Sequence, residues 1–260
     1  MPKQKSLKKN KHSFLEAKVK WTENSSSYTL LSGNIYLSDQ LGIDSRRHVF
    51  FGGNDFAKRW GAEKNLSFTI GETGFGAGLN FLITAEAWLK YRGLEGTGIL
   101  NFVSAENSPL PKKDLIRILS LTPEFSELAN DLIEYYPPPI SGIHRLYFKD
   151  KNIALTLMYG DAYDMLSSIK NSEHPFFERA NNPIFDAWFL DGFSPKDNPE
   201  IWSAEVFRVI ADLSQPGTTF SASTTDNFTK ERLIQAGFSS ETITHSKSKV
   251  GYTRGQLIDW

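Results

Sequence analysis

The stretch that decides the fold is IGETGFGAGLN, residues 70–80, in which a predicted strand runs through a glycine-rich turn into a predicted helix. Glu72 ends the strand, and Gly74, Gly76 and Gly78 follow at alternate positions. Glycines let the chain turn sharply and let a ligand lie against bare backbone. The positive N-terminus of the next helix points at the same place. We therefore predict that Glu72 and the three glycines bind a small ligand.

The spacing of the glycines narrows the choice of ligand. Dinucleotide-binding folds use G-x-G-x-x-G, in which the last glycine comes one residue later than it does here. The early carboxylate of Glu72 opposes a pyrophosphate but can receive a cation. The pattern E-x-G-x-G-x-G resembles the glycine motif of class I methyltransferases, whose cofactor S-adenosylmethionine carries an ammonium and a sulfonium. A dinucleotide oxidoreductase is therefore the least favoured function.

Outward from this motif, apolar runs with strand character alternate with helical patterns. Alternation of this kind predicts an α/β fold with a Rossmann-like, mostly parallel, doubly wound sheet. The predicted strands are Leu66–Ile70, Leu100–Ala105, Ile153–Tyr159, Phe185–Leu190 and Thr218–Ala222, with helices over Leu79–Tyr91, Ala162–Ile169 and Asn227–Ala236.

The sequence also predicts how the chain is divided. Residues 1–20 carry seven lysines against one acid and are expected to form a basic, disordered tail. Residues 21–65 are predicted to be a small β-rich extension, with a hairpin over 28–37 and a short helix over 54–60 that Asn54 caps. Residues 66–260 are predicted to form the main domain, with a helical insertion at about 109–149. An insertion of this kind commonly builds a lid or wall over a substrate site.

Acidic residues follow three further predicted strands, where ligands of such sheets bind. Glu106 is expected to accept hydrogen bonds from ribose hydroxyls. Asp161 is expected to cap a helix and, as in class I methyltransferases, to lie beside the adenine edge. Asp191 begins a rigid loop, DGFSPKDNP, and is predicted to bind both cofactor and acceptor and to act in catalysis.

Composition excludes several classes of protein. The chain of 260 residues has no cysteine, which excludes disulfide frameworks, thiolate metal sites and a cysteine nucleophile. The five histidines are scattered, so we expect no metal. No apolar run approaches the roughly 18 to 20 residues of a membrane span, and no signal peptide is evident, so we expect a cytoplasmic protein without membrane contact. Beyond the basic tail, the chain carries 22 basic and 29 acidic residues, which is unlike a broad polyanion binder.

Several segments together resemble one family, the methyltransferase domain of MnmC, which acts in tRNA 5-methylaminomethyl-2-thiouridine biosynthesis. The resemblance extends from about residue 34 to residue 237. Its most specific part is AWFLDGFSPKDNPEIW, which is far less common than the glycine motif. The segments are SRRHVFFGGN at 45–54, ETGFGAGLNFL at 72–82, VSAENSPLPKKDL at 103–115, HRL at 144–146, YGD at 159–161 and AWFLDGFSPKDNPEIW at 187–202.

This resemblance implies methyl transfer from S-adenosylmethionine to the primary amine of 5-aminomethyl-2-thiouridine, the wobble nucleotide of certain tRNA anticodons. Family members often carry a C-terminal FAD-dependent oxidase that unmasks this amine. The chain ends at Trp260, so we expect no FAD here. A separate FAD-dependent oxidase would then be a partner, or the chain would be one half of a split gene.

The loop after Asp191 and the C-terminal segment are predicted to meet the tRNA. Aromatic side chains would stack on the flipped uridine, loop residues would hold it and cations would meet phosphates. These residues are Phe193, Pro195, Lys196, Asn198, Trp202, Lys247, Lys249 and Arg254. The C-terminal segment departs from the family pattern. This departure leaves open a catalytically silent protein that binds tRNA or a partner. The acidic composition of the chain beyond the tail leaves open an N-methyltransferase of small amines.

Overall fold

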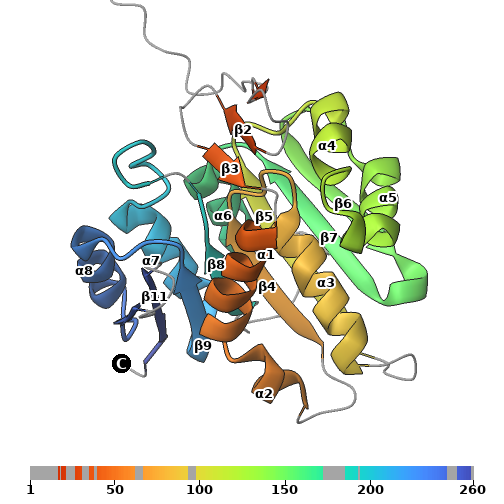
Figure 1. Ribbon diagram of the computed structural model, residues 1–260. Helices are drawn as coiled ribbons and strands as arrows, with labels where there is room; N and C mark the ends of the chain where they lie inside the picture. The colour runs from red at the N-terminus through yellow and green to blue at the C-terminus, as the bar shows by residue number, and fades with distance from the viewer. Residues whose placement is uncertain are drawn as a thin grey trace, which may run out of the picture.

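One eight-stranded sheet forms the centre of the computed structural model, in the order β10-β11-β9-β8-β4-β5-β7-β6 (Figure 1). Strands β9, β8, β4, β5 and β7 are parallel, whereas β6 and β11 run against them. The predicted mostly parallel α/β sheet is confirmed. The strands are β4 Phe68–Thr73, β5 Leu100–Glu106, β6 Gly142–Phe148, β7 Ile153–Tyr159, β8 Phe185–Leu190, β9 Ser214–Ala222, β10 Glu241–Thr244 and β11 Gly251–Gln256. The structure describes residues 17, 19–21, 27–30, 35–37, 40–61, 67–92, 98–171, 185–192, 194–244 and 251–258.

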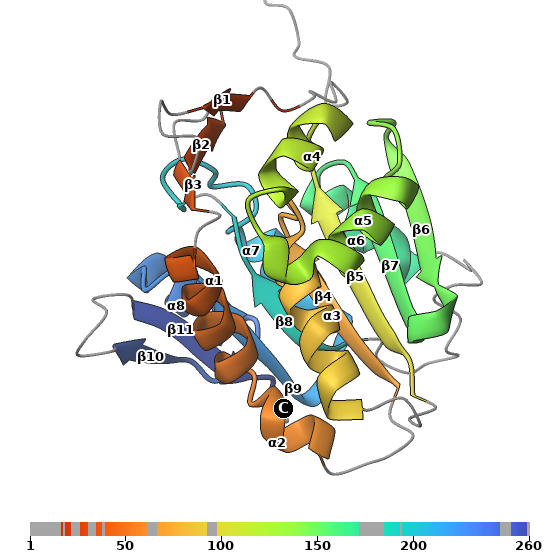
Figure 2. The same cartoon turned by 45° about the vertical axis from the view of Figure 1, so that its right-hand side comes forward.

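Helices cover both faces of this sheet (Figures 1 and 2). Successive strand residues point to opposite faces, and this alternation divides the apolar core in two. Phe102 of β5 packs in one core cluster and its neighbour Val103 in the other. One face carries α1 Gln40–Arg46, α2 Phe56–Gly61, α3 Leu79–Arg92, α4 Lys112–Leu119 and α5 Ser126–Tyr135, and the other carries α6 Ala162–Asn171, α7 Ala204–Asp212 and α8 Asn227–Gln235. None of these helices is long and apolar enough to cross a membrane.

The N-terminal region is only partly as predicted. Strands β1 Val19–Trp21, β2 Ser27–Leu30 and β3 Ile35–Leu37 form a small antiparallel sheet, in agreement with a hairpin. The short helix predicted over 54–60 is confirmed as α2, but residues 40–52 are helical instead of β-rich, with a π-helical stretch, Arg47–Gly52, after α1. Tertiary packing explains this difference, because the buried ring of Phe50 lies 5.0 Å from the ring of Phe189 in β8. The basic tail lies almost wholly outside the described residues.

The predicted helical insertion ends in a strand. Residues 109–149 contain α4, a short 3-10 turn at Pro123–Phe125 and α5, and then β6, which extends the sheet beyond β7. Strand β6 is an edge strand that alternates between exposed and buried residues along its second half. Its register pairs Leu146 with Leu155, so the insertion continues the main sheet and does not stand apart from it. A second 3-10 turn, Lys149–Lys151, connects β6 to β7.

Candidate functional site

The glycine turn crosses the carboxyl edge of the sheet between β4 and α3. Gly74, Gly76 and Gly78 all have positive φ, at 93°, 54° and 76°. Only glycine adopts this backbone at low cost. The Gly74 N–H donates to the carbonyl of Ala105 at 2.8 Å, which ties the turn to β5. A Cβ atom added at Gly74 would lie 3.1 Å from the carbonyl oxygen of Asp191, so the turn also passes close to the end of β8.

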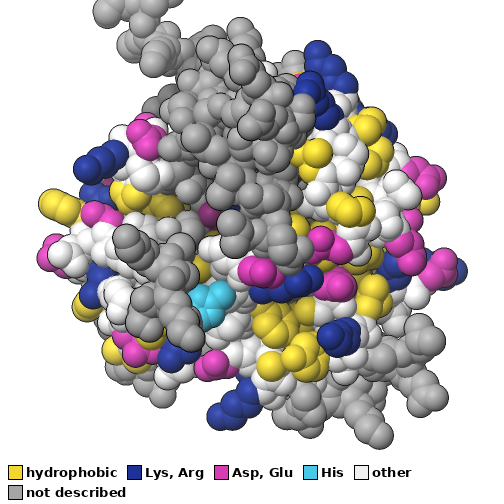
Figure 3. All heavy atoms as spheres, in the orientation of Figure 1, with side chains coloured by type: hydrophobic (Ala, Val, Ile, Leu, Met, Phe, Trp, Pro, Cys, Tyr) yellow, Lys and Arg dark blue, Asp and Glu magenta, His cyan; other side chains and the backbone are white. Residues whose placement is uncertain are grey.

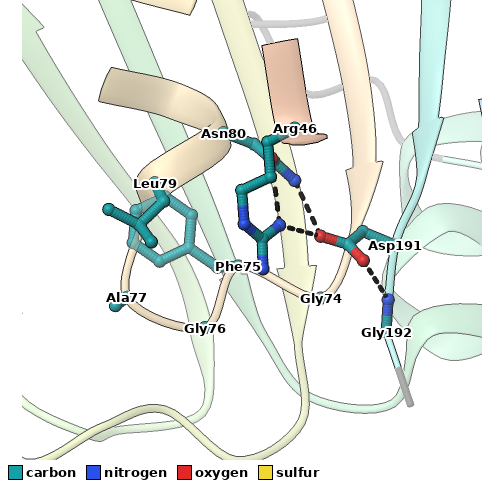
Figure 4. Close-up of a pocket in the computed structure, with 9 residues that line it drawn as sticks. All are labelled: Arg46, Gly74, Phe75, Gly76, Ala77, Leu79, Asn80, Asp191 and Gly192. Atoms are coloured by element: carbon teal, nitrogen blue, oxygen red, sulfur yellow. Dashed lines mark hydrogen bonds and ion pairs between the residues drawn. The ribbon is translucent and has the colours of Figure 1, made fainter. Parts of the chain in front are cut away.

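Two adjoining cavities open at this edge. The larger, which we call the cleft, has a volume of about 230 Å³. The smaller, which we call the inner pocket, is shown in Figure 4. Gly74, Gly76 and Gly192 line both cavities. The cleft is also lined by Ala105, Glu106, Asn107, Ser108, Leu110, Asp161, Ala162, Asn198, Glu200 and Ile201, and the inner pocket by Arg46, Phe75, Ala77, Leu79, Asn80 and Asp191.

The residues predicted to bind the ligand therefore fall into two groups. Gly74, Gly76, Glu106 and Asp161 line one cleft, as the sequence predicted. The two remaining residues of the motif, Glu72 and Gly78, are buried and line neither described cavity. A Cβ atom at Gly78 would lie 2.7 Å from the Phe75 ring, so this glycine allows close packing beneath the turn.

Glu106 is fixed by backbone donors at the end of β5. Its Oε2 accepts from the Gly76 N–H at 2.9 Å, and its Oε1 accepts from the Ser108 N–H at 2.7 Å. Burial raises the pKa of this carboxyl, and these backbone hydrogen bonds oppose the rise. An ionised carboxylate offers about four acceptor sites. Glu106 therefore keeps the capacity to accept hydroxyl donors from a ligand in the cleft.

Asp161 caps α6 and faces the cleft. Its Oδ1 accepts from the backbone N–H groups of Tyr163 and Asp164, at 2.9 and 3.2 Å. The helix-cap prediction is confirmed by these contacts. Asp161 also lines the cleft, so its carboxylate can accept a hydrogen bond from a bound base.

Glu72 is a buried carboxyl beneath the turn. Its side-chain oxygens accept from Asn80 Nδ2 at 2.8 Å and from the Ser104 hydroxyl at 2.6 Å. Only 1% of the residue is exposed. Burial raises the pKa of Glu72 to about 8, and the bonds from Ser104 and Asn80 oppose the rise. Its local effect is to hold the Asn80 amide in one orientation.

The buried Glu72 makes stability depend on pH. A carboxyl with a folded pKa of about 8 and an ordinary value of 4.5 keeps its proton in the folded state after the unfolded state has lost it. Wild-type stability therefore falls as pH rises from about 5 to 8. Glu72→Gln imitates the protonated form and lacks this loss. We expect chemical denaturation to show that the free energy of unfolding of Glu72→Gln, relative to that of wild type, rises by on the order of a few kcal/mol between pH 5.5 and 8.5. Parallel pH curves for the two proteins would contradict the assignment.

Asp191 ends β8 and joins an ion pair in the inner pocket. Its Oδ2 accepts from Arg46 Nη1 at 2.5 Å and from Asn80 Nδ2 at 2.9 Å. Its Oδ1 accepts from the Gly192 N–H at 2.9 Å and from the Ser223 hydroxyl at 3.1 Å. Figure 4 shows Arg46 and Asn80 both pointing at this carboxylate. These four donors hold the carboxylate in place at the wall of the inner pocket, where it can receive a further N–H group in exchange for one of them.

The predicted tRNA contacts are only partly brought to this site. Asn198 lines the cleft, and Pro195 and Lys196 lie in the same loop, where Lys196 is exposed. Trp202 is only 1% exposed and packs in the core, so the prediction that it stacks on a base is wrong. Arg254 pairs with Glu241 at 2.7 Å, which reduces its value as a phosphate ligand. Phe193, Lys247 and Lys249 lie outside the described residues.

Sequence reasoning missed Arg46 and Asn80. Asn80 stood in the quoted motif, and its position at the start of α3 beside the strand-end acid was a usable signal. Arg46 stood in SRRHVFFGGN, one of the segments that carry the family resemblance, but nothing in that segment pointed to Asp191, which lies 145 positions further along the chain. Among the described residues, no group of three or more His, Asp or Glu side chains is placed to hold a metal ion.

Comparison with known proteins adds an independent observation. The family described as S-adenosyl-L-methionine-dependent methyltransferase matches residues 123–258, which is more than half of the chain. This chain belongs to that methyltransferase family. The match covers β7, β8 and β9 and the loop that begins at Asp191. The methyltransferase is also similar to a solved structure described as MNMC2 from Aquifex aeolicus, with a TM-score of 0.67 over 95% of this chain and 72% of that one. Identity there is 18%, so this likeness concerns the fold, and it confirms the class I methyltransferase fold.

The methyltransferase has more similar relatives in sequence. Two are named tRNA 5-methylaminomethyl-2-thiouridine biosynthesis bifunctional protein MnmC, and this name confirms the predicted resemblance. The relative from Aeromonas salmonicida (strain A449) is 36% identical over 94% of this chain and 36% of its own length. The relative from Acinetobacter baylyi is 41% identical over 86% of this chain and 34% of its own length. The chain thus spans about a third of the length of these relatives.

The cleft of this methyltransferase fits S-adenosylmethionine. The backbone of Gly74 and Gly76 presents no side chain to the cavities, and their positive φ angles exclude most replacements. Glu106 and Asp161 supply acceptors on the cleft wall. Asp191 supplies an anion where the inner pocket meets the cleft, and the N-terminus of α3 adds a positive dipole end. These groups can hold the adenosine and the charged end of the cofactor.

Proposed function

We propose that this methyltransferase transfers a methyl group to the amine of 5-aminomethyl-2-thiouridine at the wobble position of tRNA. The observation that carries the proposal is the position of Asp191, at the end of β8 in a pocket that adjoins the cleft. The names of the relatives support the substrate, because 5-methylaminomethyl-2-thiouridine is that amine with one added methyl group. Gly74, Gly76, Glu106, Asp161 and Asp191 are proposed to bind the cofactor.

S-adenosylmethionine supplies an electrophilic methyl group on sulfur. The protein has to place an amine nitrogen in line with this methyl group. An alkylammonium has a pKa near that of lysine, about 10, and must lose a proton before it can attack. The Asp191 carboxylate is proposed to accept an N–H of the amine in exchange for one of its present donors and to fix the direction of the amine, while solvent removes the proton. Positioning of this kind supplies much of the acceleration in transfer reactions.

Glu72 and Gly78 are proposed to act indirectly. Glu72 holds the Asn80 amide, and that amide in turn donates to Asp191. Gly78 lets the Phe75 ring pack beneath the turn. Both residues therefore support the shape of the inner pocket without lining it.

One observation favours a second candidate, the N-methylation of a small amine. Two predicted tRNA contacts have other roles, because Trp202 is buried and Arg254 is paired with Glu241. Figure 3 agrees with this. On the described part of the face that it shows, Lys and Arg side chains lie among Asp and Glu side chains and do not form one broad basic patch. Any tRNA contact would thus be local, around Lys196 and the loop after β8.

The purified chain tests the two candidates directly. With labelled S-adenosylmethionine, we expect methyl incorporation into tRNA that bears 5-aminomethyl-2-thiouridine. The same tRNA without the aminomethyl group is the control and should stay unlabelled. Cells without this protein should accumulate the unmethylated nucleoside, which mass spectrometry of wobble nucleosides would detect. Labelling of small amines with none in tRNA would decide for the second candidate.

We also propose where the amine comes from. The relatives are named bifunctional, and this chain aligns with about a third of each. The family resemblance predicts that the other activity is an FAD-dependent oxidase. We infer that a separate oxidase activity exposes the amine before this chain methylates it.

A further inference from the structure

The inner pocket contains an ion pair that is mostly shielded from water. The side chains of Arg46 and Asp191 are 19% and 15% exposed, and Arg46 Nη1 contacts Asp191 Oδ2 at 2.5 Å. Asn80 binds both partners, because its Oδ1 accepts from Arg46 Nη1 at 3.1 Å and its Nδ2 donates to Asp191 Oδ2 at 2.9 Å. The two opposite charges are therefore held side by side next to the glycine turn (Figure 4).

The position of Arg46 sets it apart from the other residues that line the two cavities. Among the described residues that line the cleft and the inner pocket, it is the one basic side chain. It reaches this place from the C-terminal end of α1, on a different element from the glycine turn. A guanidinium has five N–H donors in a planar fork that matches a carboxylate.

The methyl donor ends in an α-amino acid, which is a zwitterion. Its ammonium needs an anion and its carboxylate needs a cation, within a few ångströms of each other. We propose that Arg46 binds the carboxylate of S-adenosylmethionine, and that the ammonium replaces Arg46 as a donor to Asp191. The ion pair that Asn80 holds together is thus a preformed receptor for the zwitterion, and the N-terminus of α3 favours the same carboxylate. This inference rests on the proposed use of S-adenosylmethionine.

Decarboxylated S-adenosylmethionine separates this role from a structural one, because it lacks the carboxylate and keeps the ammonium and sulfonium. Calorimetry of wild type and Arg46→Met with both ligands gives the test. We expect Arg46→Met to weaken the binding of S-adenosylmethionine about 10- to 100-fold, which is the size of effect expected when a charge-assisted hydrogen bond is lost. The decarboxylated ligand should bind within about threefold of wild type, or more tightly, because a repelling cation has gone.

Arg47→Met is the matched control. Arg47 is the neighbouring residue, but it pairs with Glu86 at 2.9 Å and does not line either cavity. Its loss should leave the affinity for both ligands unchanged. Arg46→Lys keeps the charge without the fork, and we expect it to recover part of the affinity for S-adenosylmethionine alone. If Arg46→Met does not fold, the comparison of the two ligands on Arg46→Lys against wild type decides.

Equal losses for both ligands, or no loss for either, would overturn the role of Arg46. Failure of the proposed function has a different signature. In that case the variants still discriminate between the two ligands while wild type leaves the aminomethyl tRNA unmethylated. If wild type binds neither ligand, the assignment of the cofactor and the role of Arg46 are both wrong.

Discussion

Gly76→Val is expected to reduce the affinity for S-adenosylmethionine by at least about 100-fold. Gly76 has a φ of 54°, and a β-branched residue is strongly disfavoured there. The residue lines both the cleft and the inner pocket, so added side-chain atoms compete with the ligand. Its N–H also holds Glu106 Oε2 at 2.9 Å, and a displaced backbone releases this carboxylate. Titration calorimetry of the variant measures the combined loss.

Gly217→Val provides a control with similar backbone strain. Gly217 has a φ of 88°, is exposed and has no atom within 4 Å of an added Cβ. It lies in the first half of β9, and the carboxyl edge is at the other end of that strand. We expect this variant to lose some stability and to bind S-adenosylmethionine as wild type does. Binding by Gly76→Val at the wild-type level would show that the turn does not hold the cofactor.

The central strands could be predicted because burial on both faces leaves a local pattern. Strand β7 is a continuous apolar run with every residue buried, and its predicted bounds Ile153–Tyr159 are those observed. Strand β6 escaped prediction because it is an edge strand with two exposed residues in its second half. The helical conformation of residues 40–52 escaped for another reason. It depends on tertiary packing, such as that of Phe50 against Phe189 of β8, and such packing overrides local propensity.

The residues of the candidate site also differ in whether a local sequence pattern or tertiary packing places them. Glu106 and Asp161 could be placed because parallel strands bring their carboxyl ends to one edge, so the residue after each strand is a candidate. The place of Trp202 could not be predicted in this way. Trp202 stands close in sequence to the loop after β8. Its ring nevertheless packs in the core cluster that contains Phe207, and only the fold shows this. The contact of Arg46 with Asp191 depends on the packing of α1 against α3, which the residues around Arg46 do not reveal.

Asp191→Ala is expected to lower the rate of tRNA methylation by at least about 100-fold. The variant loses the acceptor that fixes the amine, and a misplacement of the reacting groups by about 1 Å can cost about 100-fold in rate. Arg46 and Asn80 lose their shared partner and are free to enter the space of the substrate. Affinity for S-adenosylmethionine should fall less, because Glu106 and the glycine turn remain. Single-turnover rates at saturating cofactor separate the two effects.

Two variants make this result interpretable. Asp191→Asn keeps the size of the side chain and limits any effect on folding, and we expect it to lose rate on the same scale because the charge is gone. Asp212→Ala removes an exposed acid at the end of α7 that lines neither cavity and accepts from Lys170 Nζ at 2.7 Å, and it should methylate at the wild-type rate. Because Asp191 is bound by four donors, a structural role for it is a real alternative. If Asp191→Asn methylates the aminomethyl tRNA at the wild-type rate, the carboxylate only closes the turn after β8, and the amine is held elsewhere.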